Sequence, residues 1–261
     1  MSPVRASADG WLRCYRPRPD ARVRLVCLPH AGGNAAFYRP WIDLLPPTVE
    51  LAAVQYPGRL DRMTEPPVPD MPMMVRTLTA VLLADRRLPL AIFGHSMGAA
   101  IAFEVAGRLE RQHGVEPVRV VLSGRQPPEH HRSETVDVED DDALWAEVRR
   151  LGGTTDDSLD SDAIRAFALP GVRADYRLID SYAPVRRPPI ASPITALVGD
   201  ADPEVSVAEA GDWRRHSTGG FELRVFSGDH FYLVPRRTAV IADVVRVLGE
   251  PAVTRAPGAL R

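Results

Sequence analysis

Residues 93–100 read FGHSMGAA and contain the pentapeptide GHSMG, centred on Ser96. A serine with a glycine two positions before it and another two positions after it is the pattern of a nucleophile elbow. In such an elbow a strand turns abruptly into a helix and holds the serine hydroxyl at the turn. Three matching positions recur by chance in roughly one chain in ten of this size. The pattern alone leaves two interpretations open: a nucleophilic serine, or a glycine turn without chemistry.

The neighbours of this pentapeptide favour the nucleophile. The apolar run LAIFG at residues 90–94 has the composition of a strand. The run AAIAFEVAGRL at residues 99–109 has apolar residues at helical spacing, with small alanines in its first turn, where the helix must pack closely on a sheet. A strand, a glycine-flanked serine and a small-residue helix in this order predict that Ser96 is a catalytic nucleophile.

A nucleophilic serine needs a general base and a group that orients that base. His230, in SGDHFYLV, follows the last predicted strand and is the best-placed base, whereas His95 lies in the elbow itself and suits a supporting position. The run ITALVG ends in GDAD, so both Asp200 and Asp202 are candidates for the orienting acid. The order serine, aspartate, histidine is that of the α/β-hydrolases. Spacing does not choose between the two aspartates.

Attack of a serine on a carbonyl produces an oxyanion, which needs two preorganised N–H donors. One candidate is the amide of Met97, which follows the serine at the start of the predicted helix. The other lies in PHAGG at residues 29–33, after the run VRLVCL. Glycines there allow the backbone to turn an N–H inward, and Ala31 is the expected donor. A plain strand-to-helix turn is the alternative for this segment.

These residues follow short apolar runs that are typical of strands. The runs occupy residues 23–28, 51–56, 90–94, 118–124, 194–199 and 221–228. Between them, YRPWIDLL, MVRTLTAVLLADRR and AAIAFEVAGRLERQ have apolar residues at three- and four-residue spacing, as amphipathic helices do. Nearly all-apolar strands that alternate with helices predict an α/β fold: a mostly parallel central sheet with helices on both faces.

Two segments interrupt this alternation. Residues 63–74, MTEPPVPDMPMM, are expected to form an irregular connection. Residues 125–190 are longer than one crossover requires and contain three runs with helical spacing, ALWAEVRRL, SDAIRAF and VRADYRLIDSY. The acidic run at 134–142 precedes the first of these and is expected to cap that helix. We expect residues 125–190 to form a helical lid over the carboxyl edge of the sheet, where such sheets bind ligands.

Composition narrows the classes of function. The length of 261 residues favours a single α/β domain over 1–261, with the insertion at 125–190. A formal net charge of -2 gives no global field that would draw the protein to nucleic acid or to an anionic membrane. All 32 Lys+Arg residues are arginine, which excludes Schiff-base and Ser–Lys chemistry on this chain.

The cysteines and the apolar runs favour a cytoplasmic protein. Cys27 lies within VRLVCL and is expected to be a buried apolar residue, and two cysteines indicate neither a disulfide framework nor a metal site. The N-terminus lacks the apolar core of a signal peptide, and no later run approaches about 18 apolar residues. We expect a soluble monomer that uses no cofactor and no metal and binds neither nucleic acid nor membrane.

A series of motifs, in order along the chain, resembles those of the type II thioesterases, α/β-hydrolases that serve polyketide synthases and nonribosomal peptide synthetases. PHAGGNAAFYRPW is similar to the family's oxyanion loop and first helix, QYPGRLDR to its Pro-Gly-Arg turn and FGHSMGAAIAFEVA to its elbow. SGRQPP resembles the entry to its lid, LGGT and VRADYRLIDSY its lid helices, GDADPEVS its acid loop and GDHFYLV its histidine loop. Nearly the whole chain takes part, which makes the resemblance far more specific than the pentapeptide.

The resemblance implies the α/β-hydrolase fold and a role for each candidate residue. Ser96 would be the nucleophile, His230 the general base and Asp202 the orienting acid, since the family's acid loop has the form Gly-x-x-Asp and Asp202 occupies its last position. The amides of Ala31 and Met97 would form the oxyanion hole. The implied reaction is hydrolysis of a thioester through an acyl-enzyme, and no catalytic position departs from the family pattern.

The resemblance also implies a partner and a substrate. The partner would be an acyl or peptidyl carrier protein, and the substrate an aberrant or stalled acyl thioester on its phosphopantetheine arm, removed as editing during polyketide or nonribosomal peptide antibiotic biosynthesis. Met71, Met73 and Met74 would line an acyl pocket under the lid or pack in the core. The alternatives are a general carboxylesterase or peptidase with the same triad, and a protein of this fold that binds without catalysis.

Overall fold

The apolar runs of the sequence form the sheet at the centre of the molecule. The computed structural model describes residues 5–6, 10–132, 136–151 and 162–249. Within these ranges eight strands form one sheet in the order β1-β2-β4-β3-β5-β6-β7-β8, with β1 and β2 antiparallel and the others parallel. Their bounds are β1 (Arg5–Ala6), β2 (Leu12–Cys14), β3 (Val23–Leu28), β4 (Val49–Val54), β5 (Leu90–His95), β6 (Arg119–Ser123), β7 (Ile194–Gly199) and β8 (Phe221–Phe226).

The predicted strands are confirmed, with small shifts of their ends. The runs at 23–28 and 194–199 are strands over their full predicted length. The strand predicted at 51–56 begins and ends two residues earlier, at Val49–Val54. β1 and β2 escape a sequence-based prediction, because strands of two and three residues are too short to show a period. The mostly parallel α/β architecture is as predicted.

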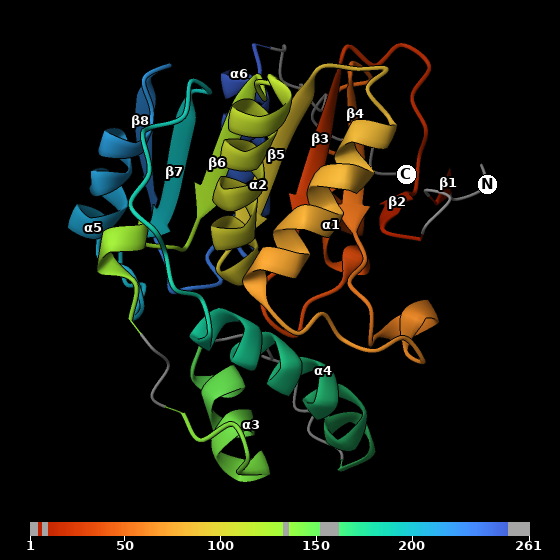
Figure 1. Ribbon diagram of the computed structural model, residues 1–261, viewed down its shortest axis with the longest axis vertical. Coiled ribbons are helices and arrows are strands. Elements are labelled where there is room, and N and C mark those ends of the chain that lie inside the picture. Colours follow the sequence, from red (N-terminus) through yellow and green to blue (C-terminus); the bar gives the residue numbers. More distant parts are fainter. Residues whose placement is uncertain (1–4, 7–9, 133–135, 152–161, 250–261) are drawn as a thin grey trace, which may run out of the picture.

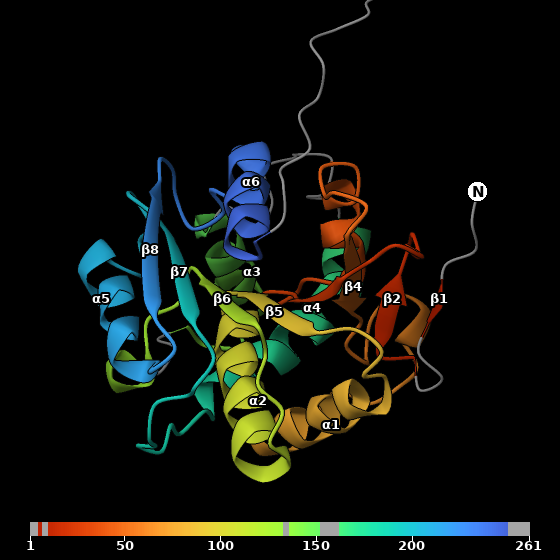
Figure 2. The ribbon, with the colours of Figure 1, turned by 90° about the horizontal axis from the view of Figure 1, so that it is seen from above.

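Helices cover both faces of the sheet (Figure 2). α1 (Met71–Ala84) and α2 (Met97–His113) lie on one face, and α6 (Arg237–Val247) lies on the other with the 3-10 segment η1 (Ala35–Trp41). Successive residues of β3 enter different cores: Val26 packs on the α1–α2 side, whereas Cys27, fully buried as predicted, packs on the η1–α6 side. Both faces are therefore apolar, as a helix-covered parallel sheet requires.

Two sequence-based boundaries are wrong. YRPWIDLL, predicted to be a helix, contributes only its first four residues to the 3-10 segment η1, where Pro40 lacks the N–H that an α-helix needs. The irregular segment predicted at 63–74 is also too long, since α1 begins at Met71. The Asp70 side chain caps that helix by accepting a hydrogen bond from Met73 N at 2.6 Å.

The three methionines at the start of α1 do not line the cavity described below. Met71 and Met74 are 3% and 2% exposed and belong to the core between α1, α2 and the sheet. Met73 is exposed. Core packing is therefore the correct prediction for Met71 and Met74, and the pocket prediction is wrong for all three.

The segment between β6 and β7 leaves the sheet and lies beyond the carboxyl ends of the parallel strands (Figure 1). It contains η3 (Pro128–His130), α3 (Asp141–Arg150) and α4 (Asp162–Asp180). The sequence shows two helical runs where the structure has the single helix α4, because Pro170 is accommodated within it. Asp140 caps α3 by accepting hydrogen bonds from Asp142 N and Ala143 N, as the acidic run predicts.

Parts of the predicted lid lie outside the described residues. These are residues 133–135, where the acidic run begins, and 152–161, which contain most of LGGT. The extent of the lid, 125–190, and its function as a lid stay predictions. The remaining elements are η2 (Leu60–Arg62), α5 (Val207–Gly211) and η5 (Asp212–His216). No helix in the described part of the chain is long and apolar enough to cross a membrane.

Candidate active site

Ser96 lies at the junction of β5 and α2 with a strained backbone. Its φ of 54° and ψ of -119° lie in a region that costs a non-glycine residue about 1–3 kcal/mol. Its amide donates a hydrogen bond of 2.8 Å to the Ser123 carbonyl oxygen of the neighbouring strand β6. Ser96 is partly exposed, whereas His95 and Met97 on either side are buried. The turn therefore has the geometry of a nucleophile elbow.

Close backbone contacts require both glycines of the pentapeptide. A Cβ on Gly94 would lie 2.1 Å from the Gly98 carbonyl oxygen. A Cβ on Gly98 would lie 2.2 Å from the carbonyl oxygen of Leu28, at the end of β3. Both neighbours are backbone atoms, which cannot rotate away. Glycine at 98 therefore allows the start of α2 to approach the loop that follows β3.

We expect Gly98→Ala to lower the free energy of unfolding by about 3 kcal/mol or more, because the added methyl group must displace the main chain. Gly107→Ala in the same helix is the matched control, since the atoms nearest to its Cβ would belong to the movable guanidinium of Arg111, 2.7 Å away. In a helix interior, alanine is also more stabilising than glycine by about 1 kcal/mol. Urea unfolding measures both variants. Equal losses of stability would contradict the contact at Gly98.

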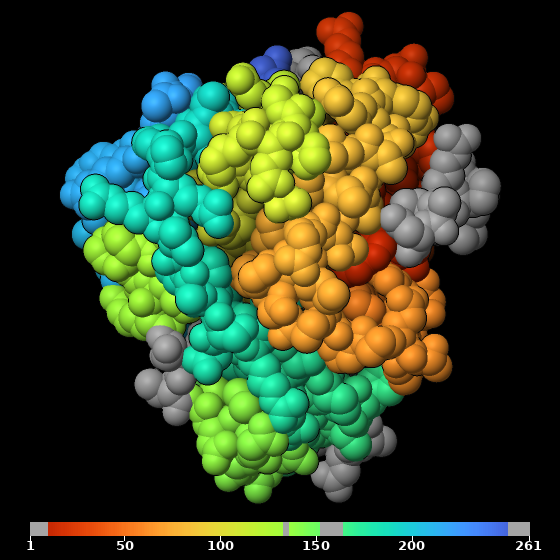
Figure 3. Space-filling model, viewed as in Figure 1, coloured from red at the N-terminus to blue at the C-terminus, as the bar shows by residue number. Residues whose placement is uncertain are grey.

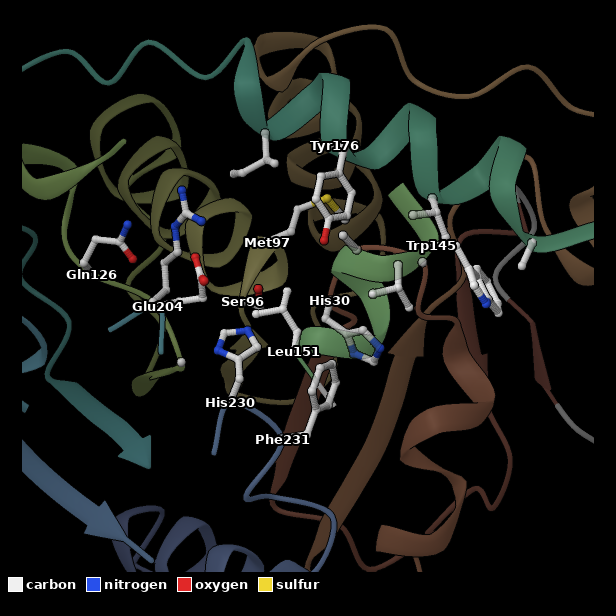
Figure 4. Close-up of a pocket in the computed structure, with 18 of the residues that line it drawn as sticks. His30, Ser96, Met97, Gln126, Trp145, Leu151, Tyr176, Glu204, His230 and Phe231 are labelled. Carbon is white, nitrogen blue, oxygen red and sulfur yellow. The ribbon is translucent and has the colours of Figure 1, made fainter. Parts of the chain in front are cut away.

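His230 lies beside the serine with a carboxylate behind it. Its Nδ1 is 2.9 Å from Asp202 Oδ2 and 3.0 Å from Oδ1. The Asp202 side chain is 0% exposed and that of His230 is 2% exposed. Figure 4 shows the His230 ring next to the Ser96 hydroxyl. Nε2 of His230 is buried and has no hydrogen-bond partner within the described ranges, so this atom can accept the serine proton.

The two candidate aspartates have different contacts. Asp200 Oδ1 accepts a hydrogen bond of 2.9 Å from Gly228 N, so Asp200 holds the loop that carries the histidine. Asp202 contacts the imidazole itself and also accepts a hydrogen bond of 2.9 Å from Glu204 N. The structure thus brings Asp202, and not Asp200, to His230. Orientation of the base by Asp202 stays a prediction.

Both predicted oxyanion donors lie on the cavity that contains the serine. Ala31 and Met97 line it. Met97 is the first residue of α2, so its N–H lies at the positive end of the helix dipole. Ala31 lies in a turn over residues 30–33, which is closed by a hydrogen bond of 2.9 Å between its first and last residues. Gly32 in this turn has a φ of 75°, which favours glycine.

The cavity beside Ser96 has a volume of about 200 Å³ and is walled on one side by α3 and α4 (Figure 4). The α3 side contributes Trp145, Val148 and Leu151, and α4 contributes Ile164, Ala168, Val172, Tyr176 and Ile179. Arg125, Gln126 and Glu204 are polar residues on its lining. The position of these residues on a cavity could not be predicted from the sequence. Helical periodicity indicates which side chains share a face, but not that the face borders a cavity.

Two further histidines lie near His230: His95 is fully buried and His30 is half-buried. The ring of His95 lies 5.0 Å from that of His230 and 5.9 Å from that of His30. Burial, followed by the proximity of His230, lowers the pKa of His30 to about 3. The same causes lower the pKa of His95 well below its usual range. His95 Nδ1 lies 3.0 Å from Ser123 Oγ, so His95 is a neutral, hydrogen-bonded ring in a supporting position.

We expect the free energy of unfolding to fall as the pH is lowered from about 6.5 toward 3. In this window unfolded histidines take up protons, whereas His30 and His95 stay neutral in the folded state. The unfolded state then binds more protons, and each histidine adds a slope of about 1.4 kcal/mol per pH unit. Urea unfolding at stepped pH values measures the slope. His95→Gln should make it shallower, and an unchanged slope would contradict the neutral, buried state of His95.

Comparisons with known proteins identify relatives of this chain. Residues 23–247 match the family described as "Thioesterase domain". The chain is 46% identical over 252 residues to the probable cadicidin biosynthesis thioesterase of Streptomyces griseus, covering 95% of this chain and 69% of that protein. It is 42% identical over 245 residues to thioesterase PikA5 of Streptomyces venezuelae, covering 93% of this chain and 86% of that protein.

A solved structure extends the likeness to the fold. The type II thioesterase BorB from the borrelidin biosynthetic cluster has a TM-score of 0.83 and 39% identity, and the match covers 95% of this chain and 100% of BorB. The predicted α/β-hydrolase fold and the resemblance to type II thioesterases are thereby confirmed. The chain belongs to the thioesterase family.

Proposed function

We propose that this chain hydrolyses acyl groups from the phosphopantetheine arm of a carrier protein through an acyl-enzyme on Ser96. The observation that carries the proposal is the hydrogen bond of His230 with the buried Asp202 carboxylate, beside the strained turn at Ser96. A serine, a histidine and an aspartate in these positions perform acyl transfer. The cadicidin and borrelidin pathways of the relatives support a carrier-bound thioester as substrate.

Acylation begins when His230 Nε2 takes the proton of the Ser96 hydroxyl as Oγ attacks the thioester carbonyl carbon. A C–O bond forms, and the carbonyl oxygen becomes an oxyanion stabilised by the amides of Ala31 and Met97. The C–S bond then breaks, and the departing thiolate receives the proton from His230. Asp202 keeps the Nδ1–H tautomer of the imidazole and stabilises its positive form.

Deacylation repeats these roles with water as the nucleophile. His230 takes a proton from a water molecule as its oxygen attacks the acyl carbon of the Ser96 ester. The same two amides stabilise the second oxyanion. The bond between the acyl carbon and Oγ breaks, Oγ recovers a proton from His230, and the carboxylic acid leaves. These steps use side chains, backbone amides and water.

The apolar lining of the cavity supports an acyl substrate. Most of the residues that α3 and α4 contribute are apolar, as a pocket for an acyl chain requires. In this proposal residues 125–190 form the lid that covers the acyl group, and the enzyme acts as a cytoplasmic monomer on a separate carrier protein. Release of aberrant or stalled acyl groups would then edit the products of an assembly line.

A panel of acyl-carrier proteins, assayed beside the matching acyl-CoA thioesters and p-nitrophenyl esters, tests the proposed substrate. We expect the highest kcat/KM for the carrier-bound thioesters, because only these substrates contain both the phosphopantetheine arm and the carrier protein. Faster turnover of the oxygen esters than of the acyl-carrier thioesters would reject the proposal and favour a general carboxylesterase.

A further inference from the structure

A buried ion pair joins α4 to the segment between β4 and η2. Arg59, just before η2, and Asp175, on α4, are 8% and 4% exposed. Arg59 Nη2 lies 2.7 Å from Asp175 Oδ1, and Nη1 lies 2.8 Å from Oδ2. This is the bidentate arrangement that gives an arginine–carboxylate pair its strength and its defined orientation.

The same two side chains also bind the backbone of the turn at residues 30–33. Asp175 Oδ2 accepts a hydrogen bond of 2.7 Å from Gly32 N. Arg59 Nη1 donates a hydrogen bond of 2.7 Å to the Gly33 carbonyl oxygen. The turn has one hydrogen bond of its own, which closes it. Among the residues that the structure describes, two of the three hydrogen bonds that hold this turn therefore come from outside it.

α4 also packs directly on the turn. A Cβ on Gly32 would lie 2.8 Å from Val172 Cγ2. Val172 and Asp175 are three residues apart, so they lie on the same face of α4. Figure 3 shows the atoms of α4 in contact with those of the segment that precedes α1. One face of this helix thus reaches the turn both by packing and by a hydrogen bond.

The carboxylate of Asp175 selects one orientation of the peptide between Ala31 and Gly32. Type I and type II turns differ by a flip of this peptide, and only the type II turn has a positive φ at its third residue, here Gly32. The flipped form would replace the Gly32 N–H by the Ala31 carbonyl oxygen and direct that oxygen toward a buried carboxylate. Such a contact is unfavourable where water is excluded. Asp175 therefore stabilises the turn that presents the Ala31 backbone as it is observed.

We infer that Asp175 and Arg59 are positioning residues for the oxyanion hole, through which α4 holds the turn that bears the Ala31 donor. The inference rests on the proposed function, in which the Ala31 N–H stabilises the oxyanion. α4 then positions a donor that stabilises the transition state, and it also forms a wall of the cavity. Because a misplaced donor weakens binding of the oxyanion and not of the substrate, loss of the support lowers kcat and leaves KM.

The Arg59→Met/Asp175→Leu double variant tests this inference. Apolar residues of similar volume often replace a buried ion pair without loss of stability, whereas a single substitution leaves an unpaired buried charge. We expect kcat for an acyl-carrier thioester to fall about 10- to 100-fold, with KM unchanged within about twofold. Urea unfolding establishes that the variant is folded.

A second variant keeps the test decisive if the first does not fold. Arg59→Lys retains a positive charge beside Asp175, but its single nitrogen cannot reproduce the planar fork that binds the carboxylate and the Gly33 carbonyl oxygen together. We expect kcat to be about 3- to 10-fold lower, again with KM unchanged. Wild-type kcat in a folded form of either variant would overturn the inference.

The Glu139→Gln/Arg177→Gln double variant is the matched control. It removes an exposed ion pair between α4 and the segment before α3. Neither side chain takes part in the hydrogen bonds of the turn described above, so the variant should keep the wild-type kcat. A rise in KM with unchanged kcat in the apolar double variant would show that α4 only binds substrate, and would also overturn the inference. Wild-type kcat in a folded variant and a raised KM with unchanged kcat both leave the proposed function intact. Unchanged hydrolysis in Ser96→Ala would instead overturn the proposed function itself.

Discussion

The Ser96→Ala variant will lose acyl-thioester hydrolysis by about four to six orders of magnitude in kcat. Without Oγ no acyl-enzyme forms, and the remaining rate comes from substrate binding and the oxyanion donors alone. Steady-state release of free thiol from an acyl-carrier protein measures the loss. A variant that kept a tenth of the wild-type kcat would contradict Ser96 as the nucleophile and would favour a different catalytic group.

The fold should survive this substitution, because alanine and serine experience the same backbone strain at a φ of 54°. Ser96→Gly serves as the companion variant. It is equally unable to form an acyl-enzyme, and it relieves the strain at the turn. We expect it to be about 1 kcal/mol more stable than Ser96→Ala after the entropic cost of glycine is subtracted. Urea unfolding of the two variants separates loss of chemistry from loss of structure.

Asp202→Asn will lower kcat by about 10³- to 10⁴-fold. An asparagine amide can donate a hydrogen bond to Nδ1 and so stabilise the tautomer of His230 with its proton on Nε2. That tautomer cannot accept the proton of the serine. The neutral amide also fails to stabilise the imidazolium that forms in the transition state.

Asp200→Asn is the control for this substitution, because the two aspartates follow the same strand. An asparagine there retains an oxygen that can accept the hydrogen bond from Gly228 N. We expect kcat within about threefold of wild type, since this hydrogen bond supports the loop without touching the imidazole. The reverse ranking of the two variants would contradict the assignment of Asp202.

The elbow could be predicted from the sequence because its determinants lie close together along the chain. The apolar strand, the glycines and the small-residue helix all fall between Leu90 and His113, within β5 and α2. The choice between Asp200 and Asp202 could not be derived in this way. It depends on contacts with the loop at 228–230, which is 28 residues away and reaches the aspartates only in the folded sheet.

The contact between Arg59 and Asp175 is even less visible in the sequence. Arg59 and Asp175 are 116 residues apart, and neither belongs to a local pattern that indicates a partner. Both lie in motifs that resemble those of the family, QYPGRLDR and VRADYRLIDSY. A matching motif does not indicate which side chains are in contact. The start of α1 shows a local failure of another kind. Asp70 and the following proline are good helix-start signals, but they are obscured by the prolines around them.

The most direct test of the central claim is mass spectrometry of the enzyme quenched during turnover of a slowly hydrolysed acyl-carrier thioester. We expect a transient mass increase equal to the acyl group, located on the peptide that contains Ser96 and absent from Ser96→Ala. An acyl group on another residue, or hydrolysis with no covalent adduct at any quench time, would contradict the acyl-enzyme mechanism.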